Sequence, residues 1–208
     1  MKTNIRIFLK NISKSFGGRL LFSNITAGCE PGQCLAITGH NGSGKSTLLK
    51  IIAGLLRPSS GQITFFNASG QELSVGERQH CIGMVAPDLA MYSALTGMEN
   101  ILFWTNMRGT MLTLAQAERL CSEAGLGGAG RKQVQTYSTG MRQRLKLAVT
   151  KALKPAVWLL DEPYSNLDAA GKAYVRELIA GAINNDAVVL LATNEPEEAR
   201  YAGGKIEL

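Results

Sequence analysis

Alternating and continuous apolar stretches divide this chain into strands and helices. Apolar and polar residues alternate from Asn4 to Ile12, which predicts a half-buried strand that turns at Gly17–Gly18. Apolar positions at helical spacing predict helices over 45–56 and 168–183. Continuous apolar runs are typical of strands buried on both faces of a parallel sheet, and these runs cover residues 34–38, 157–160 and 187–192. The alternation of strands and helices predicts an α/β fold.

The middle of the chain has a helical pattern throughout. From 96 to 153 the apolar spacing favours helices, and Thr96 and Thr113 each begin a capping box. A third helix is expected to start near Ser138, after a glycine-rich break. We therefore expect one domain, 1–208, whose α/β core comprises 1–86 and 151–208 and is interrupted by a helical subdomain at about 87–150.

Composition narrows the class of protein. Hydrophobic residues at 45% and charged residues at 18% exclude a disordered tail, a collagen and a coiled coil. The longest apolar run, Ala187–Ala192, is far below the roughly 18 residues of a membrane helix, and the first ten residues lack the apolar stretch of a secretory signal. We expect a cytoplasmic protein, or one at the cytoplasmic face of a membrane. The net charge of +6 permits several anionic partners and selects none, because the basic residues are dispersed.

The segment GHNGSGKST, from Gly39 to Thr47, matches the phosphate-binding pattern G-x-x-x-x-G-K-[ST] between a predicted strand and a predicted helix. Its glycines let consecutive backbone N–H groups point into one concavity at a helix N-terminus. Lys45 is expected to reach the β- and γ-phosphates, and the Ser46 hydroxyl to coordinate Mg²⁺. The predicted phosphate-contacting residues are Gly39, His40, Asn41, Gly42, Ser43, Gly44, Lys45, Ser46 and Thr47.

Two acids end the apolar strand at 157–160. Acids at the carboxyl end of a strand lie at the edge where open α/β sheets bind ligands. Asp161 is the expected Mg²⁺ partner, through water or Ser46, and Glu162 is placed to activate a water against the γ-phosphate. The alternative is that both acids cap the following segment.

A further motif, YSTGMRQR at 137–144, shortly precedes this strand. A serine hydroxyl and free N–H groups at a helix start form a second anion site, which makes sense if it serves the nucleotide of a partner copy. Here the chain resembles the ATP-binding subunits of ABC transporters, whose signature is usually Leu-Ser-Gly-Gly-Gln. Ser138 and Gly140 match that signature, whereas Tyr137, Thr139 and Met141 depart from it as in export-type members. Ser138 also fits an ordinary helix N-cap.

This resemblance covers essentially the whole chain and implies further features. It implies a P-loop NTPase core with a mostly parallel sheet, an N-terminal antiparallel β region and the inserted helical subdomain. Phe16 occupies the position of the aromatic residue that stacks on adenine, with a core residue as the alternative. Asp168, in the D-loop Ser165–Asp168, is implied to contact the opposite phosphate loop across a dimer.

Two positions depart from the family pattern. Thr193–Asn194 stands where a γ-phosphate-contacting histidine is usual, so Asn194 joins Lys45 and Glu162 as a candidate catalytic residue that cannot become cationic. Pro87 replaces a glutamine that usually follows its strand. The neighbouring Asp88 is a further candidate Mg²⁺ partner through water, with a solvated turn as the alternative.

The resemblance implies an ATPase that binds ATP and Mg²⁺ and dimerises with a second copy of itself. It would drive separate integral membrane permease subunits, lying peripherally on the inner face of the cell membrane, with no nucleic acid as partner. The export-like signature is similar to that of simple exporters, including the haem-export ATPases of cytochrome c maturation. The alternatives are a non-transport clamp ATPase and a slow nucleotide-gated interaction module. Apolar residues of the helical subdomain, such as Leu95, Phe103 and Trp104, either line a groove for a partner helix or pack internally.

Overall fold

The computed structural model describes residues 4–195 and 197–208, so the first three residues of the expected core segment and Pro196 lie outside the description. Within this described part, the chain forms two compact units. The sheet unit contains the described residues up to Ala86 together with 156–162 and 181–208, and the helical unit contains 87–155 and 163–180. The sequence predicts boundaries between the α/β core and the helical subdomain at 86/87 and about 150/151, and these boundaries stay a proposal. The packing groups 163–180 with the helical unit.

An antiparallel sheet begins the sheet unit. In it β1 (Arg6–Phe16) lies between β2 (Arg19–Cys29) and β4 (Ser60–Phe66). Ile7, Leu9 and Ile12 of β1 are buried in the core, as the alternating pattern predicts. The expected N-terminal antiparallel β region is confirmed.

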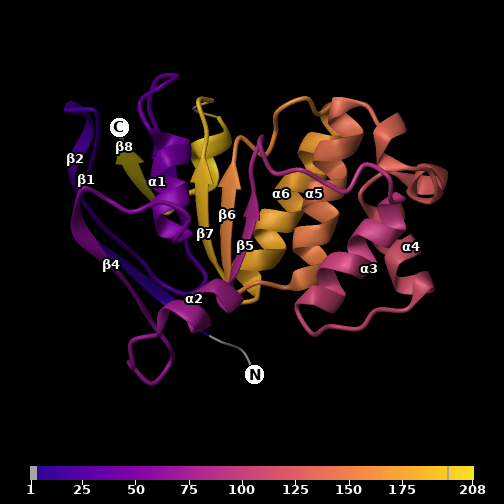
Figure 1. The fold of residues 1–208 in the computed structure, drawn as a ribbon, viewed down its shortest axis with the longest axis horizontal. Coiled ribbons are helices and arrows are strands. Elements are labelled where there is room, and N and C mark those ends of the chain that lie inside the picture. Colours follow the sequence, from indigo (N-terminus) through magenta and orange to yellow (C-terminus); the bar gives the residue numbers. More distant parts are fainter. Residues whose placement is uncertain (1–3, 196) are drawn as a thin grey trace. The chain divides into compact units, whose positions relative to one another are not determined.

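A parallel sheet follows, in the order β5-β6-β7-β3-β8 among the described residues. Figure 1 shows β5, β6 and β7 of this sheet side by side and running the same way. The register aligns Ile37, Ala192 and Asp161 across β3, β7 and β6, so the carboxyl ends of these three strands meet at one edge. The strands are β3 (Cys34–Thr38), β5 (Ile82–Val85), β6 (Val157–Asp161), β7 (Val188–Ala192) and β8 (Gly204–Glu207).

The helices of the sheet unit depart from expectation in two places. Helix α1 (Lys45–Ile52) ends four residues before the predicted Leu56, because the chain turns at Gly54 with φ +74°. Helix α2 (Val75–Cys81) was not predicted, although Ser74 and Glu77 form a capping box at its start. Apolar periodicity gave no signal there, since α2 buries none of its residues.

The helical unit contains α3 (Gly97–Met107), α4 (Leu114–Glu123) and α5 (Thr139–Leu153), with 3₁₀ turns at Gly127–Arg131 and Val134–Thr136. The capping boxes predicted at Thr96 and Thr113 are confirmed. Helix α6 (Ala169–Asn184) begins in this unit, and its last residues, from Gly181, belong to the sheet unit. A short 3₁₀ turn, Glu198–Tyr201, precedes β8.

Candidate nucleotide-binding site

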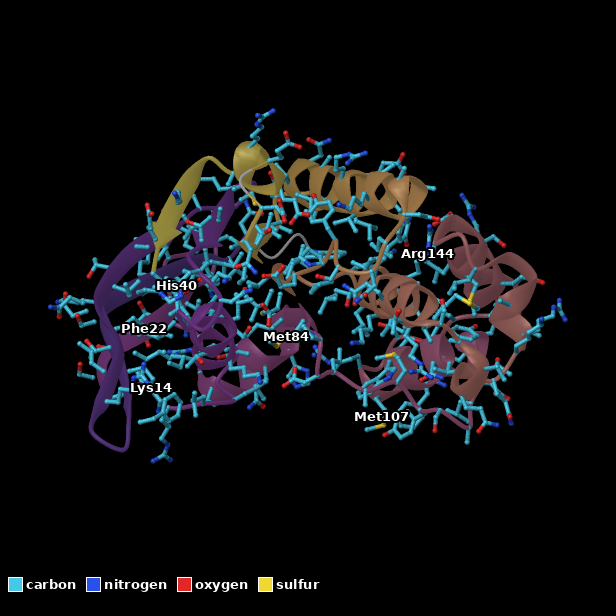
Figure 2. The ribbon with its side chains drawn as sticks, turned by 90° about the horizontal axis from the view of Figure 1, so that it is seen from above. Lys14, Phe22, His40, Met84, Met107 and Arg144 are labelled. Carbon is cyan, nitrogen blue, oxygen red and sulfur yellow. The ribbon has the colours of Figure 1, made fainter. Side chains whose placement is uncertain are left out.

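The predicted phosphate loop joins β3 to α1 at the carboxyl edge of the sheet. Gly44 is the N-cap of α1 and has φ +109°, a left-handed conformation that strains any residue with a side chain. A Cβ atom at this position would also lie 2.7 Å from Cδ1 of Phe22 in β2. Figure 2 shows Phe22 of β2 and His40 of the loop in the same region of the sheet unit. The loop backbone can therefore hold its open N–H groups toward a ligand at the helix start.

The side chains of this loop fit a polyphosphate. Lys45 is 6% exposed, and its Nζ donates to the carbonyl oxygens of Gly39 at 2.9 Å and His40 at 3.2 Å. The buried hydroxyl of Ser43 has no hydrogen-bond partner in the described part of the chain, while Ser46 is exposed at the first turn of α1. Phosphate oxygens would supply acceptors both for the unpaired hydroxyl and for an ammonium group now bonded to its own loop.

A cleft of about 400 Å³ opens beside the loop, within the size range of small-molecule sites. Phe16 in its wall is 52% exposed, so the alternative of a core residue is wrong. The Nζ atom of Lys14 lies 4.7 Å from the centroid of the Phe16 ring. The cleft thus has both an exposed aromatic ring and phosphate-loop residues in its lining, a combination that suits an adenine nucleotide. It is lined by Phe16, Arg19, Leu20, Leu21, His40, Gly42, Ser43 and Leu208.

The two predicted acids end β6 at the same edge. Asp161 is 2% exposed, and Glu162 follows it with φ +49°, an uncommon conformation for a residue with a side chain. The Glu162 N–H donates to the carbonyl oxygen of Ala192 at 3.0 Å, which ties this turn to the end of β7. Burial raises the pKa of Glu162; the Lys45 ammonium opposes that shift, and nearby carboxylates, Asp161 first, add to it. A carboxyl group with a raised pKa is suited to accept a proton.

The end of β7 reaches the phosphate loop. The Nδ2 atom of Asn194 donates to Oδ1 of Asn41 at 2.6 Å. Thr193 is buried, donates to Glu198 and accepts the N–H of Glu195, which orders the turn after the strand. The structure therefore brings Asn194 to the loop, where its amide binds a side chain of the loop itself.

The oxygen donors beside the loop suit Mg²⁺. The described residues hold no cluster of three or more histidine, cysteine or acidic side chains able to bind a metal. Mg²⁺ is usually held by one or two protein oxygens together with substrate phosphates and water, and the Ser46 hydroxyl and the Asp161 carboxylate have that chemistry. Asp88, the third candidate, belongs to the helical unit, where it faces the ammonium group of Lys146.

The signature residues lie in the helical unit. Ser138 is the N-cap of α5, and its hydroxyl accepts the N–H of Met141 at 3.2 Å, so the N-cap interpretation is confirmed. A Cβ atom on Gly140 would lie 2.6 Å from the carbonyl oxygen of Asn166, because the D-loop backbone packs directly on the first turn of α5. Thr139, beside it, is exposed.

Asp168 caps α6 within its own chain. Its carboxylate accepts the N–H of Gly171 at 2.8 Å and pairs with Arg144 of α5 at 2.5 Å. The Gly171 N–H, followed by Arg144, holds the pKa of this carboxyl group below its usual value. A contact of Asp168 with an opposite phosphate loop stays a prediction.

The sequence pattern did not predict that polar side chains of α5 donate hydrogen bonds to backbone carbonyl oxygens of other segments. The Arg144 side chain is 11% exposed and also donates to the carbonyl oxygen of Ala124 at 2.8 Å. Gln143 and Lys146, both buried, donate to carbonyl oxygens outside the helix. Buried polar residues that break the apolar periodicity of a helix were the available signal.

These features define a P-loop ATPase, and comparison with known proteins agrees. Residues 22–165 match the ABC transporter family, and the chain therefore belongs to that family. The chain is 35% identical over 192 residues to the cytochrome c biogenesis ATP-binding export protein CcmA of Mesorhizobium japonicum, covering 92% of this chain and 93% of the relative.

Two solved structures share the fold. One, the ATP-binding subunit of an ABC transporter, has a TM-score of 0.84 and 26% identity, covering 97% of this chain and 85% of that one. The other, a dimeric ATP-binding cassette in a post-hydrolysis state with ADP and Pi, has a TM-score of 0.83 and 24% identity, covering 97% and 94%. The fold and family expected from the sequence are confirmed, and this chain is an ATP-binding and ATP-hydrolysing domain of the family.

Proposed function

We propose that two copies of this chain close around two ATP molecules with Mg²⁺ and drive export through separate membrane subunits. The observation that carries the proposal is the convergence of three strand ends in the sheet unit. The phosphate loop after β3, Asp161 and Glu162 after β6, and Asn194 after β7 share one edge of the parallel sheet. That edge combines phosphate binding, oxygen donors for a metal and a base.

Each residue at this edge has a distinct task in the proposal. Lys45 leaves its loop carbonyls and donates to the β- and γ-phosphates, while the loop N–H groups hold the remaining phosphate oxygens. Ser46 and Asp161 would hold Mg²⁺, which would supply positive charge to neutralise the phosphates. Glu162 orients a water and accepts its proton, a task that its raised pKa supports. Phe16 stacks on the adenine ring.

The second copy supplies the signature residues. Ser138, Thr139, Gly140 and Met141 start α5 in the helical unit, whereas the phosphate loop belongs to the sheet unit of the same chain. The open N–H groups at the start of α5 have the chemistry to bind the γ-phosphate of a partner copy's ATP. The similar dimeric cassette with ADP and Pi supports an assembly of this kind.

Membrane subunits complete the proposed transporter. No helix in the described range is long and apolar enough to cross a membrane. The export proteins of cytochrome c biogenesis among the relatives support export as the direction. In the helical unit, Tyr92 is 47% exposed, and its ring packs edge-on against Phe103 and tilted against Trp104, with ring centroids 4.7 and 5.8 Å away. This aromatic cluster, with the segment around Asp88, is the proposed surface for a permease helix.

ATP hydrolysis by the purified chain tests the proposal. Glu162→Gln should lower the rate by about 10²–10⁴-fold, because it removes the base while keeping the shape of the side chain. Glu177→Gln, which makes the same change at an exposed position of α6, is the matched control and should hydrolyse at the native rate. Hydrolysis by Glu162→Gln within a few-fold of the native rate would show that Glu162 is not the base.

A slow nucleotide-gated module is the second candidate function, and one contact favours it. The Asn194 amide is bonded to Asn41, so the position of the usual histidine offers the phosphate a neutral and already engaged donor. Native turnover that does not rise when a membrane partner is added would favour this function over transport.

A further inference from the structure

A lysine is buried in the middle of the signature helix. Lys146 of α5 is 8% exposed, and its Nζ atom donates to the carbonyl oxygen of Pro87 at 2.9 Å. Lysine is rarely buried to this degree without a partner, since withdrawing an ammonium group from water is costly. Both residues lie in the helical unit, so this contact is internal to one compact body.

The positive charge of Lys146 is balanced by Asp88, the residue that follows Pro87. Burial lowers the pKa of the Lys146 ammonium, and the carboxylate of Asp88 opposes that shift. Pro87 and Asp88 are themselves exposed, so the buried cation reaches outward to a short surface segment. Lys146 therefore fixes residues 87–88 to α5 through a hydrogen bond and a charge interaction.

Helix α5 also binds the segment that follows β6, the strand next to β5. Pro87 comes two residues after the last residue of β5, and Pro163 comes two residues after the last residue of β6. The Nε2 atom of Gln143, a residue that is 7% exposed, donates to the carbonyl oxygen of Pro163 at 3.0 Å. Since β5 and β6 pair in register, α5 binds the two chain segments that leave adjacent strands of the sheet.

We propose that Lys146 is a positioning residue that couples the signature motif at the start of α5 to the segment 87–88. The inference rests on the proposed function. There the start of α5 binds the partner copy's ATP, and the strands next to residues 87 and 163 lead to this chain's own site. A displacement of α5 on contact with the partner's nucleotide is transmitted through Lys146 to the segment that follows β5. Hydrogen bonds between elements can carry coupling of this kind, and α5 makes one to each of these two segments.

Lys146→Met separates positioning from stability. Methionine keeps an unbranched stem in the core but removes the hydrogen bond and the charge. Because Asp88 and Pro87 are exposed, water can solvate both after the change, so no unpaired group is buried and the melting temperature should stay near the native value. We expect kcat for ATP hydrolysis to fall roughly tenfold, with ATP affinity changed by less than about twofold.

Lys151→Met is the matched control. It removes the same charge from the same helix, where Lys151 pairs at 2.7 Å with Glu123 in a partly exposed ion pair. It should leave kcat within about twofold of the native value. If the native chain hydrolyses ATP and Lys146→Met has the same kcat, the coupling role of Lys146 is overturned while the proposed function stands. If the native chain does not hydrolyse ATP, the proposed function is overturned as well. A fall in kcat that merely follows a lower melting temperature would also contradict the inference.

Asp88→Asn provides a second test that does not disturb the core. In the native background it should lower kcat a few-fold, and in the Lys146→Met background it should change kcat little, because the two groups act as a pair. Equal effects in both backgrounds would show that Asp88 acts independently of Lys146, as a Mg²⁺ partner would, and would contradict the proposed coupling.

Discussion

Glu162 combines two features that are costly in a folded chain. Its backbone is left-handed at φ +49°, and its carboxyl group is partly buried near Asp161, Glu195 and Glu198, with Lys45 as the opposing charge. Strain and like charges of this kind are typical of functional sites, where the surrounding structure enforces them. Here the N–H of Glu162 is held by Ala192 of the neighbouring strand, which fixes where the side chain begins.

The raised pKa of Glu162 gives a prediction about stability. The folded chain binds this proton more tightly than the unfolded chain, so stability falls as pH rises from the ordinary glutamate value through the raised one. Glu162→Gln should therefore melt at a higher temperature than the native chain at pH 7, and the difference should shrink as pH falls below the ordinary pKa. Thermal unfolding without nucleotide at several pH values measures this, and identical melting curves at pH 7 would contradict it.

The contact between Asn194 and Asn41 gives a second residue-scale prediction. A histidine at 194 can carry positive charge toward the transferring phosphoryl group, so Asn194→His should raise kcat, roughly tenfold, with little change in ATP affinity. Asn194→Ala removes the bond to Asn41 and should lower kcat below the native value. Steady-state hydrolysis by the three forms decides the matter: equal rates would show that residue 194 does not act on the phosphate.

Among the elements, those with strong local signals were the predictable ones. The bounds of β3 and the capping boxes of α3 and α4 follow from apolar runs and cap residues, and the phosphate loop follows from its glycines. Helix α2 was missed because it buries no face. The contacts of α5 with segments 87 and 163 join residues far apart in the sequence, and no local pattern reports them. Likewise, the engagement of Asp168 with Arg144 depends on packing between α5 and α6.

The packing of the D-loop on α5 gives a prediction at this scale. Gly140→Ala would place a Cβ atom 2.6 Å from the Asn166 carbonyl oxygen, so the D-loop or the signature turn must shift. We expect a lower melting temperature, by a few degrees, and slower hydrolysis. Gly76→Ala in α2 is the matched control, because its Cβ atom would meet nothing within 4 Å and alanine favours a helix by up to about 1 kcal/mol. A Gly140→Ala protein as stable and active as Gly76→Ala would contradict this packing.

For the whole molecule, the proposed function places each of the two ATP molecules between the two chains. The phosphate loop and Glu162 belong to the sheet unit, and the signature residues to the helical unit. The sequence indicated both anion sites from their motifs and implied the dimer through family resemblance. The residues that couple the sites could not be predicted, because their roles depend on which distant segments α5 binds. The central claim is therefore an ATP-dependent dimer in which Ser138 of one copy completes the site of the other.

Sedimentation of Glu162→Gln with ATP and Mg²⁺ tests that claim most directly. Blocked hydrolysis should leave the ATP-bound dimer populated. Adding Ser138→Arg should return the protein to a monomer, because the bulky cation prevents closure on the partner's phosphate. The affinity for ATP should stay near its value in the monomer. Ser122→Arg, the same change at an exposed position of α4, should leave the dimer intact. A dimer undiminished by Ser138→Arg would contradict the composite site.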